Sequence, residues 1–321
     1  MNMIKNYKIH CISEALSPIT HMMGSSGNES VLNREYILHN NVLKQIPVLS
    51  GNAIRHRMIR EPGVLYLIQV CDLVGKLNID QANYLFNGGS LTESSISENL
   101  AKIANMQELL PLIRLLGGSF RNQVVGGSLI VLRGLLICEE NRNRIIKMIP
   151  SQYTMPDNVF RSSEDFIDQY QYTRGDTRKR VDAKLILDGK ENNEDTNLMI
   201  YNGQTIIAGS IFYHGFILQN VSYLELGALL HSLSQWEFNN GTIGGSLRIG
   251  HGKLKMEIFF EEDKDFMGSE INIGQAIIDY IEHVDKNKSK IVDWLFSTFP
   301  KIEKKKGKKD DQKLENNSLL D

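Results

Sequence analysis

The sequence predicts an α+β fold in which the order strand, helix, strand occurs twice, and three observations predict it. Tyr7 to Leu16 alternates between apolar and polar residues, as a half-buried strand does. Leu129 to Cys138 is a mostly apolar run with the length of a buried strand. Ser222 to Glu237 opens on a capping box and then carries apolar residues at helical spacing. In outline the chain reads βαββαβ, an order shared by ferredoxin-like and RRM-type sheets.

Helical stretches separated by turn residues dominate the first half of the chain after its first strand. Pro62-Gly63 is expected to interrupt one of these helices, because proline removes a backbone hydrogen bond and clashes with the preceding turn. The expected segments are a polar loop at Ser17 to Asn33, a short extended piece at Pro47 to Leu49, a helix at Ala53 to Glu61 that resumes at Val64 to Leu77, and a helix at Ser97 to Leu116.

The second half is expected to alternate between strands, helices and glycine-rich turns. Residues 150 to 200 are polar and charged, which indicates an insertion or a projecting hairpin. The other expected elements are a strand at Met199 to Leu218 with a break near Gly209, a strand at Lys253 to Phe260, and helices at Ile271 to Val284 and at Ile291 to Phe299.

These elements predict one domain over residues 1–300, with a helical insertion at about 62–116 and a hairpin-like insertion at 151–200. A lysine-rich tail over 301–321 is expected to be disordered, since it can bury almost nothing. The tail carries seven lysines and five acidic residues, and the whole chain has a net charge of −2, which leaves −4 for the rest. A nucleic-acid partner would therefore need a local basic face.

Composition excludes several other classes of protein. No apolar run approaches the roughly 20 residues needed to span a bilayer, and the N-terminal residues lack the apolar core of a signal peptide. The three cysteines, Cys11, Cys71 and Cys138, are far apart in sequence and suggest no disulfide framework. We therefore expect a cytoplasmic protein.

The segment from Ile46 to Arg60 is the most informative part of the chain. A short apolar extended piece leads into a Ser-Gly-Asn turn, and a helix then opens with arginine in its first turn. Free backbone N–H groups, the positive end of the helix dipole and a guanidinium together make an anion site. The candidate residues are Gly51, Asn52, Arg55 and Arg57, with Arg60 following. The alternative is a capped surface helix with ordinary solvated arginines.

Two glycine-rich loops join a helix to a strand at matching places of the two halves. Both mix glycine with arginine and with amide or imidazole donors, so a backbone or a ligand can approach closely. The first offers Gly118, Arg121, Asn122 and Gln123, and the second offers Gly245, Arg248, His251 and Lys253. Their repetition favours a track for a phosphate backbone, while tight turns alone remain the alternative.

A third candidate segment, Gln169 to Arg180, places tyrosines beside Arg174 and Arg178. Aromatic rings stack on nucleobases and arginines contact phosphates. Nearby aspartates offset much of the charge, so a solvated charged segment is the alternative.

Signals for catalysis or cofactors are weak. No two of the eight histidines lie within one helical turn of each other, and none pairs with a nearby cysteine. The sequence contains no nucleophile elbow, and no G-K-[ST], the end of a P-loop motif, follows a glycine run. We therefore expect no metal, no cofactor and no catalytic residue.

Six motifs taken in order resemble a known family. They are ALSPITH, IPVLSGNAIRHRM, LLGGSFRNQVVGGSLIV, YQYTRGDTRKR, MIYNGQTIIAGSIFYHGFIL and GTIGGSLRIGHGKL, spread over residues 7 to 260. The chain resembles the RAMP-superfamily backbone subunit, the seventh Cas family, of class 1 CRISPR effector complexes, in the form found in type IV systems.

The resemblance implies an RRM-like palm with inserted fingers and thumb, in a subunit of an antiviral ribonucleoprotein. Such subunits polymerise into a helical oligomer along a guide RNA (crRNA), together with other effector subunits, and the guide pairs with target DNA or RNA. The matching positions are Gly51, Asn52 and Arg55 at the helix start, Gly118, Asn122 and Gln123 in the first loop, Gly245, Gly250, His251 and Gly252 in the second loop, and Arg174, Asp176 and Arg178.

One departure from the family bears on catalysis. Type III relatives cut target RNA with an aspartate in the loop after the first strand, and His21 to Arg34 contains no aspartate. We therefore expect a binder and not an enzyme. Two alternatives stay open: a relative that cleaves RNA through Glu29 or His21, and an α+β scaffold protein that binds no nucleic acid.

Overall fold

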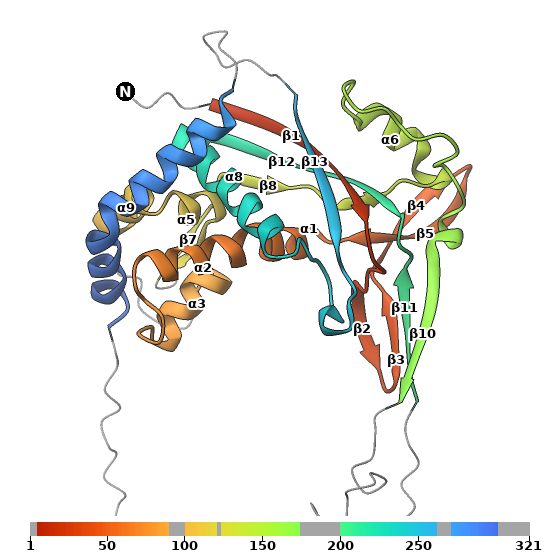
Figure 1. The fold of residues 1–321 in the computed structure, drawn as a ribbon, viewed down its shortest axis with the longest axis horizontal. Helices are drawn as coiled ribbons and strands as arrows, with labels where there is room; N and C mark the ends of the chain where they lie inside the picture. The colour runs from red at the N-terminus through yellow and green to blue at the C-terminus, as the bar shows by residue number, and fades with distance from the viewer. Residues whose placement is uncertain (1–4, 90–99, 121–122, 174–199, 262–270, 301–321) are drawn as a thin grey trace, which may run out of the picture.

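A computed structural model describes residues 5–89, 100–120, 123–173, 200–261 and 271–300. The described part is arch-shaped, with a sheet across the top, a helical lobe as one leg and a narrow β arm as the other (Figure 1). The expected tail, 301–321, lies outside the described residues, as do 174–199 of the expected hairpin region.

The top of the arch is a sheet of seven described strands in the order β13-β1-β12-β9-β5-β4, with β8 also pairing with β12. Every pairing in it is antiparallel. The strands are β1 (Lys5–Ala15), β4 (Arg34–His39), β5 (Val42–Leu49), β8 (Leu129–Val131), β9 (Gly134–Leu136), β12 (Ile211–Val221) and β13 (Leu254–Phe260). The mixed α+β class is confirmed.

Strands β1 and β12 run through the middle of this sheet and are buried along most of their length. Alternation along β1 sends Ile9 and Cys11 into the main core and Ile12 into a smaller cluster on the other side. Helices cover the main core, and the segment around α6 covers the smaller cluster (Figure 1).

The helical lobe contains most of the described helices. The described helices are α1 (Gly51–Ile54), η1 (Arg55–Arg60), α2 (Glu61–Val70), α3 (Ile79–Asn87), α4 (Leu100–Leu109), α5 (Pro111–Leu116), η2 (Glu139–Asn141), α6 (Arg142–Met148), η3 (Ser163–Phe166), α8 (Tyr223–Phe238), η5 (Leu247–Ile249) and α9 (Ile273–Thr298). The Ser222 capping box is confirmed: its hydroxyl accepts from the Glu225 N–H, and the Glu225 carboxylate accepts from the Ser222 N–H.

The predicted break at Pro62-Gly63 is wrong, because α1, η1 and α2 form one continuous helix. Element η1 is a π-helical stretch, and the N–H of Glu61 bonds to the carbonyl of His56 five residues back. This widened turn immediately precedes Pro62, so the ring is accommodated where the usual bonding pattern has already shifted. Gly63 is buried against Ser232 and Leu112, where a larger side chain has no room.

Four other element predictions need correction. The expected loop at Ser17 to Asn33 contains the hairpin β2 (Met22–Ser26) and β3 (Glu29–Leu32). The expected strand at Leu129 to Cys138 is split into β8 and β9, and the expected helix at Ser97 to Leu116 is split at Pro111 into α4 and α5. The two expected C-terminal helices are one helix, α9.

The arm is a four-stranded sheet in the order β10-β11-β3-β2. Its two later strands in the sequence are β10 (Ile167–Thr173) and β11 (Ile200–Ile206), which pair antiparallel, while β11 and β3 pair in parallel. A separate small hairpin, β6 (Gly118–Phe120) and β7 (Gln123–Val125), lies in the helical lobe. No described helix is long and apolar enough to cross a membrane.

We predict that the free energy of unfolding falls in mild acid, because two histidines, His214 and His231, are buried in the folded chain. Burial lowers the pKa of His214 and of His231 to about 4, against 6.5 in an unfolded chain. The folded state therefore keeps its full stability above pH 6.5 and loses it as pH falls toward 4. We expect the free energy of unfolding in urea to be about 2 kcal/mol lower per histidine at pH 5 than at pH 7.5.

The His231→Phe variant is the control for this pH effect. His231 lies between Tyr66 and Tyr280, with ring centroids at 4.1 Å and 5.5 Å, and phenylalanine keeps these ring contacts without a titrating group. The variant should show a smaller difference between the two pH values. Equal stability of the parent protein at both would contradict the assignment of neutral buried imidazoles.

Candidate nucleic-acid interface

The continuous helix begins at a well-formed cap. Ser50 is the N-cap, and its hydroxyl accepts a hydrogen bond from the N–H of Ala53 at 3.2 Å. The backbone N–H of Ser50 itself donates to Nε2 of His21 at 3.0 Å. Helix geometry leaves the first N–H groups, those of Gly51 and Asn52, without partners inside the helix. The helix start therefore offers free donors at the positive end of the helix dipole.

A cavity of about 420 Å³ opens directly at this helix start. Three arginines from different elements line it: Arg55 from η1, Arg34 from β4 and Arg133 from the turn between β8 and β9. The other lining residues are Asn33, Val48, Ser50, Gly51, Asn52 and Val131. Three guanidiniums, backbone donors and amide side chains make a site for an anion such as a phosphate.

Arg55 is the arginine of this cavity that is available to a ligand. Arg34 lies 3.4 Å from the carboxylate of Glu164, and Arg133 lies 3.4 Å from that of Glu35. Arg55 forms no ion pair with any residue that the structure describes. Partial burial lowers its pKa, yet a guanidinium stays protonated at neutral pH. An unpaired and partly desolvated charge favours an anionic partner.

The arginines that follow Arg55 have other partners. Arg57 forms an ion pair with Glu61 one turn later. Arg60, which the sequence grouped with the anion site, is buried, and its guanidinium donates to the carbonyls of Leu85 at 3.0 Å and Gly117 at 3.1 Å. Burial, with Arg55 nearby, lowers the pKa of Arg60 to about 10. The role of Arg60 is therefore structural, and it is not one of the solvated arginines that the surface-helix alternative expects.

The glycines of the first loop allow close packing of backbone on backbone. A Cβ on Gly118 would lie 2.8 Å from the carbonyl oxygen of Gly88, and one on Gly117 would lie 2.4 Å from the nitrogen of Gly127. Gly117 also has a positive φ of 67°. The tight-turn alternative thus accounts for these glycines. Gln123 begins β7 and is partly buried.

The second loop, residues 244–252, packs on the chain that follows β1. Gly244 has a φ of 82°, and the N–H of Gly245 donates to the carbonyl of Thr20 at 2.7 Å. Nδ1 of His251 lies 2.6 Å from the hydroxyl of Thr20. Arg248 and Lys253 are exposed, and neither forms an ion pair with a described residue.

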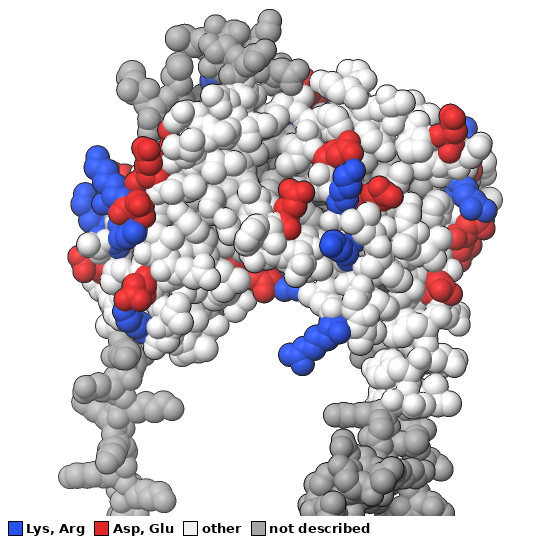
Figure 2. Space-filling view, in the orientation of Figure 1, with Lys and Arg blue, Asp and Glu red and all other residues white. Residues whose placement is uncertain are grey.

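The helix start lies between the two loops. His21 contacts Ser50 on one side, and its neighbour Thr20 contacts the second loop. At the other end of η1, Arg60 bonds to Gly117 of the first loop. In Figure 1, α1 lies below the sheet, between the helical lobe that contains β7 and the loop beside β2. Figure 2 shows a hollow between the helical lobe and the arm, into which a basic side chain projects, while basic and acidic atoms both lie along its upper edge.

Four candidate residues, Arg121, Asn122, Arg174 and Arg178, lie outside the described residues. Among the described ones, the structure brings Gly51, Asn52 and Arg55 together in the cavity. Gly51 also packs against β8, since a Cβ there would lie 2.9 Å from the carbonyl oxygen of Val131.

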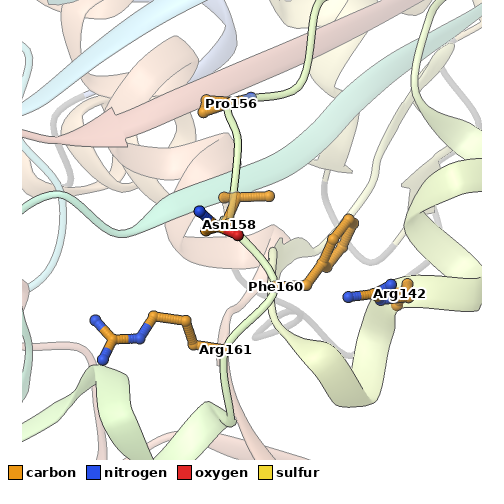
Figure 3. A pocket seen from close by; sticks show the side chains of 6 residues that line it. Arg142, Pro156, Asn158, Phe160 and Arg161 are labelled. Atoms are coloured by element: carbon orange, nitrogen blue, oxygen red, sulfur yellow. The ribbon is translucent and has the colours of Figure 1, made fainter.

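A second cavity, of about 480 Å³, lies beside α6 (Figure 3). Figure 3 shows the Arg142 side chain pointing toward Phe160 and Arg161 pointing away from both. Arg142 lies 4.6 Å from the Phe160 ring centroid and 2.8 Å from Glu139, and Arg161 lies 3.6 Å from Asp165. Because both guanidiniums have partners within the chain, we assign no ligand to this cavity.

Sequence reasoning missed two of the three cavity arginines. Arg34 reaches the cavity only because residues 22–49 fold into two hairpins. A loop was expected there as far as Asn33. Arg133 is the single charged residue within the apolar run Leu129 to Cys138. That interruption was the available signal, since it marks the turn between β8 and β9.

No protein-family model and no curated protein matches this chain. Solved structures do resemble it. One is a chain of a structure named "Type IV-B CRISPR Complex", with 18% sequence identity, a TM-score of 0.48, and coverage of 78% of this chain and 90% of that one. Another is Csc2 of Thermofilum pendens, with 11% identity, a TM-score of 0.36, and coverage of 91% of this chain and 81% of that one.

Proposed function

We propose that this chain is a guide-RNA-binding backbone subunit of a class 1 CRISPR effector complex of the type IV kind. The observation that carries the proposal is the cavity at the helix start, where Arg34, Arg55 and Arg133 meet the free N–H groups of the helix. Arg55, which has no acidic partner among the described residues, and the free N–H groups are the donors available to a phosphate, whichever base its nucleotide carries. A surface of this kind holds a strand in place, while base pairing by the guide supplies sequence specificity.

The central sheet corresponds, in this proposal, to a palm of RRM type. Two strand–helix–strand units support it: β1, the helix run 51–70 and β8, followed by β12, α8 and β13. Strand β12 pairs with both β1 and β8, and β13 pairs with the other edge of β1. This interleaved antiparallel order is the one expected of a βαββαβ sheet.

Copies of the chain would line up along the guide, together with other effector subunits, in the cytoplasm. Target DNA or RNA would reach the complex only through pairing with the guide. The hollow between the helical lobe and the arm lies below α1, the helix at whose start the cavity opens (Figures 1 and 2). A strand lying along the underside of the arch would pass Arg248 and Lys253 and then the helix start.

The chain binds RNA without cutting it, in this proposal. His21, one of the two residues considered for cleavage, has a structural role. Its Nε2 accepts a hydrogen bond from the N–H of Ser50, and burial lowers the pKa of its ring. An imidazole held in this way is neutral, and its contacted nitrogen is occupied. Glu29, the other residue, is the exposed first residue of β3.

The test of the proposed function uses the purified full chain and a fluorescein-labelled oligouridylate. Anisotropy should show binding that weakens steeply with salt, because phosphate contacts release counterions. The same mixture with Mg²⁺, run on a denaturing gel, should show intact RNA. Absence of binding at low salt would contradict the proposal and favour a scaffold protein. Cleavage lost in Glu29→Ala would favour a nuclease.

A further inference from the structure

Four aromatic rings lie in a row along the arm and end at the second glycine loop. The rings of Tyr172 and Tyr201 are stacked at 5.1 Å with an interplanar angle of 12°, and those of Tyr170 and Tyr172 lie at 6.2 Å and 9°. Tyr170 meets His251 edge-on at 5.4 Å. Register explains the row, because Tyr172 pairs with Tyr201 across the two strands and Tyr170 lies two residues before Tyr172 on the same face.

Tyr170 has a structural reason to be there. Its ring lies over Gly203, its cross-strand partner, where a Cβ would come within 2.5 Å of a ring carbon. An aromatic side chain that covers a glycine in this way supports the sheet. Tyr170 is therefore accounted for without a ligand.

Tyr172 and Tyr201 have no such explanation. Tyr172 is 53% exposed, and Tyr201 is only partly buried. Exposed parallel rings present a flat apolar surface with a π-face, which is the chemistry that stacks on a nucleobase. We call this pair the tyrosine shelf.

Basic groups lie at one end of the row. His251, which contacts Tyr170, belongs to the same loop as Arg248, and Lys253 follows directly after it. Both cations are exposed and lack an acidic partner among the described residues. Aromatic rings that lead into unpaired cations suit a single strand, whose bases stack and whose phosphates pair.

We propose that the tyrosine shelf is a stacking site for one or two unpaired bases of a single-stranded RNA. This inference rests on the proposed function and adds a contact to bases where the cavity contacts phosphates. Stacking is insensitive to which base is present, since every base has a π-face. The shelf therefore contributes affinity without sequence preference.

The experiment compares oligouridylate with a strand of equal length that carries abasic residues, by anisotropy over a range of salt. Three variants are measured: Tyr172→Leu, which keeps an apolar side chain, Tyr172→Trp, which keeps a ring, and Tyr36→Leu, a control at a tyrosine that is 65% exposed on β4. Tyr172→Leu should bind oligouridylate about fivefold more weakly. Its salt dependence should not change, since no phosphate contact is lost.

Tyr172→Trp and Tyr36→Leu should bind oligouridylate as the parent does, and Tyr172→Leu should bind the abasic strand as the parent does. If the parent binds RNA and Tyr172→Leu binds oligouridylate equally well, the shelf is overturned while the proposed function stands. If Tyr172→Leu changes only self-association, the face is a protein contact and the inference also falls. If the parent binds no RNA, both proposals fail together.

Discussion

Arg55→Glu is expected to weaken binding of single-stranded RNA by about tenfold, whatever the sequence of the RNA. The reason is the position of Arg55 in the cavity at the helix start, without an ion pair to any described residue. A charged hydrogen bond to phosphate contributes about 1.5–3 kcal/mol, and reversing the charge adds repulsion. The slope of log affinity against log salt should fall by about one contact.

Arg161→Glu is the matched control for this prediction. Arg161 is an exposed arginine beside the α6 cavity, paired with Asp165 at 3.6 Å. The Arg161→Glu substitution changes the net charge of the chain by the same amount as Arg55→Glu. Only the Arg55 variant should alter the salt slope. Equal effects of the two variants would mean that RNA senses overall charge and that Arg55 is no specific phosphate ligand.

Arg60→Met is expected to lower the free energy of unfolding by about 3 kcal/mol. The substitution removes two charge-assisted hydrogen bonds and leaves the carbonyls of Leu85 and Gly117 buried without partners. Relief of the buried charge offsets part of this loss. The helix end at Leu85 and the first glycine loop should therefore loosen together. Urea unfolding measures the change directly.

Arg161→Met serves as the control here, because an exposed arginine contributes little to stability. Below its unfolding transition, Arg60→Met should retain most of its RNA affinity, since Arg60 is 7% exposed and its guanidinium donates to carbonyls within the chain. A stable Arg60→Met protein with weakened RNA binding would reverse the assignment and return Arg60 to the anion site.

Local signals in the sequence predicted part of the fold well. The Ser222 capping box and the apolar face of α8 depend on residues three or four positions apart, which can be read without tertiary contacts. Alternation in β1 and the break near Gly209 between β11 and β12 were equally visible. Each of these elements is decided by its own residues.

Elements decided by distant partners were missed. The arm strands β2 and β3 are short, and they are strands because they pair with each other and because β3 also pairs with β11. In the hairpin of β4 and β5, Asn40 and Asn41 both have positive φ, a turn signal present in the sequence but not used. The break expected at Pro62 failed because a π-helical turn, stabilised by packing, precedes it.

In the candidate site too, residues that are neighbours in sequence were predicted, and residues brought together by distant pairing were not. The helix-start motif around Arg55 was predicted because cap, turn and arginine are neighbours in sequence. The roles of Arg57 and Arg60 were not predicted, because three arginines so close together in sequence do not indicate which of them is buried. Arg34 and Arg133 join the cavity from other strands, and only their pairing brings them to Arg55.

The most direct test of the central claim is to sequence the nucleic acid that copurifies with the full chain from its host. We expect short RNA of one origin, with spacer sequences from a CRISPR array, protected against nuclease along stretches covered by several copies of the chain. Protein with the ultraviolet absorbance ratio of a nucleic-acid-free sample, or with only random cellular RNA, would contradict the claim.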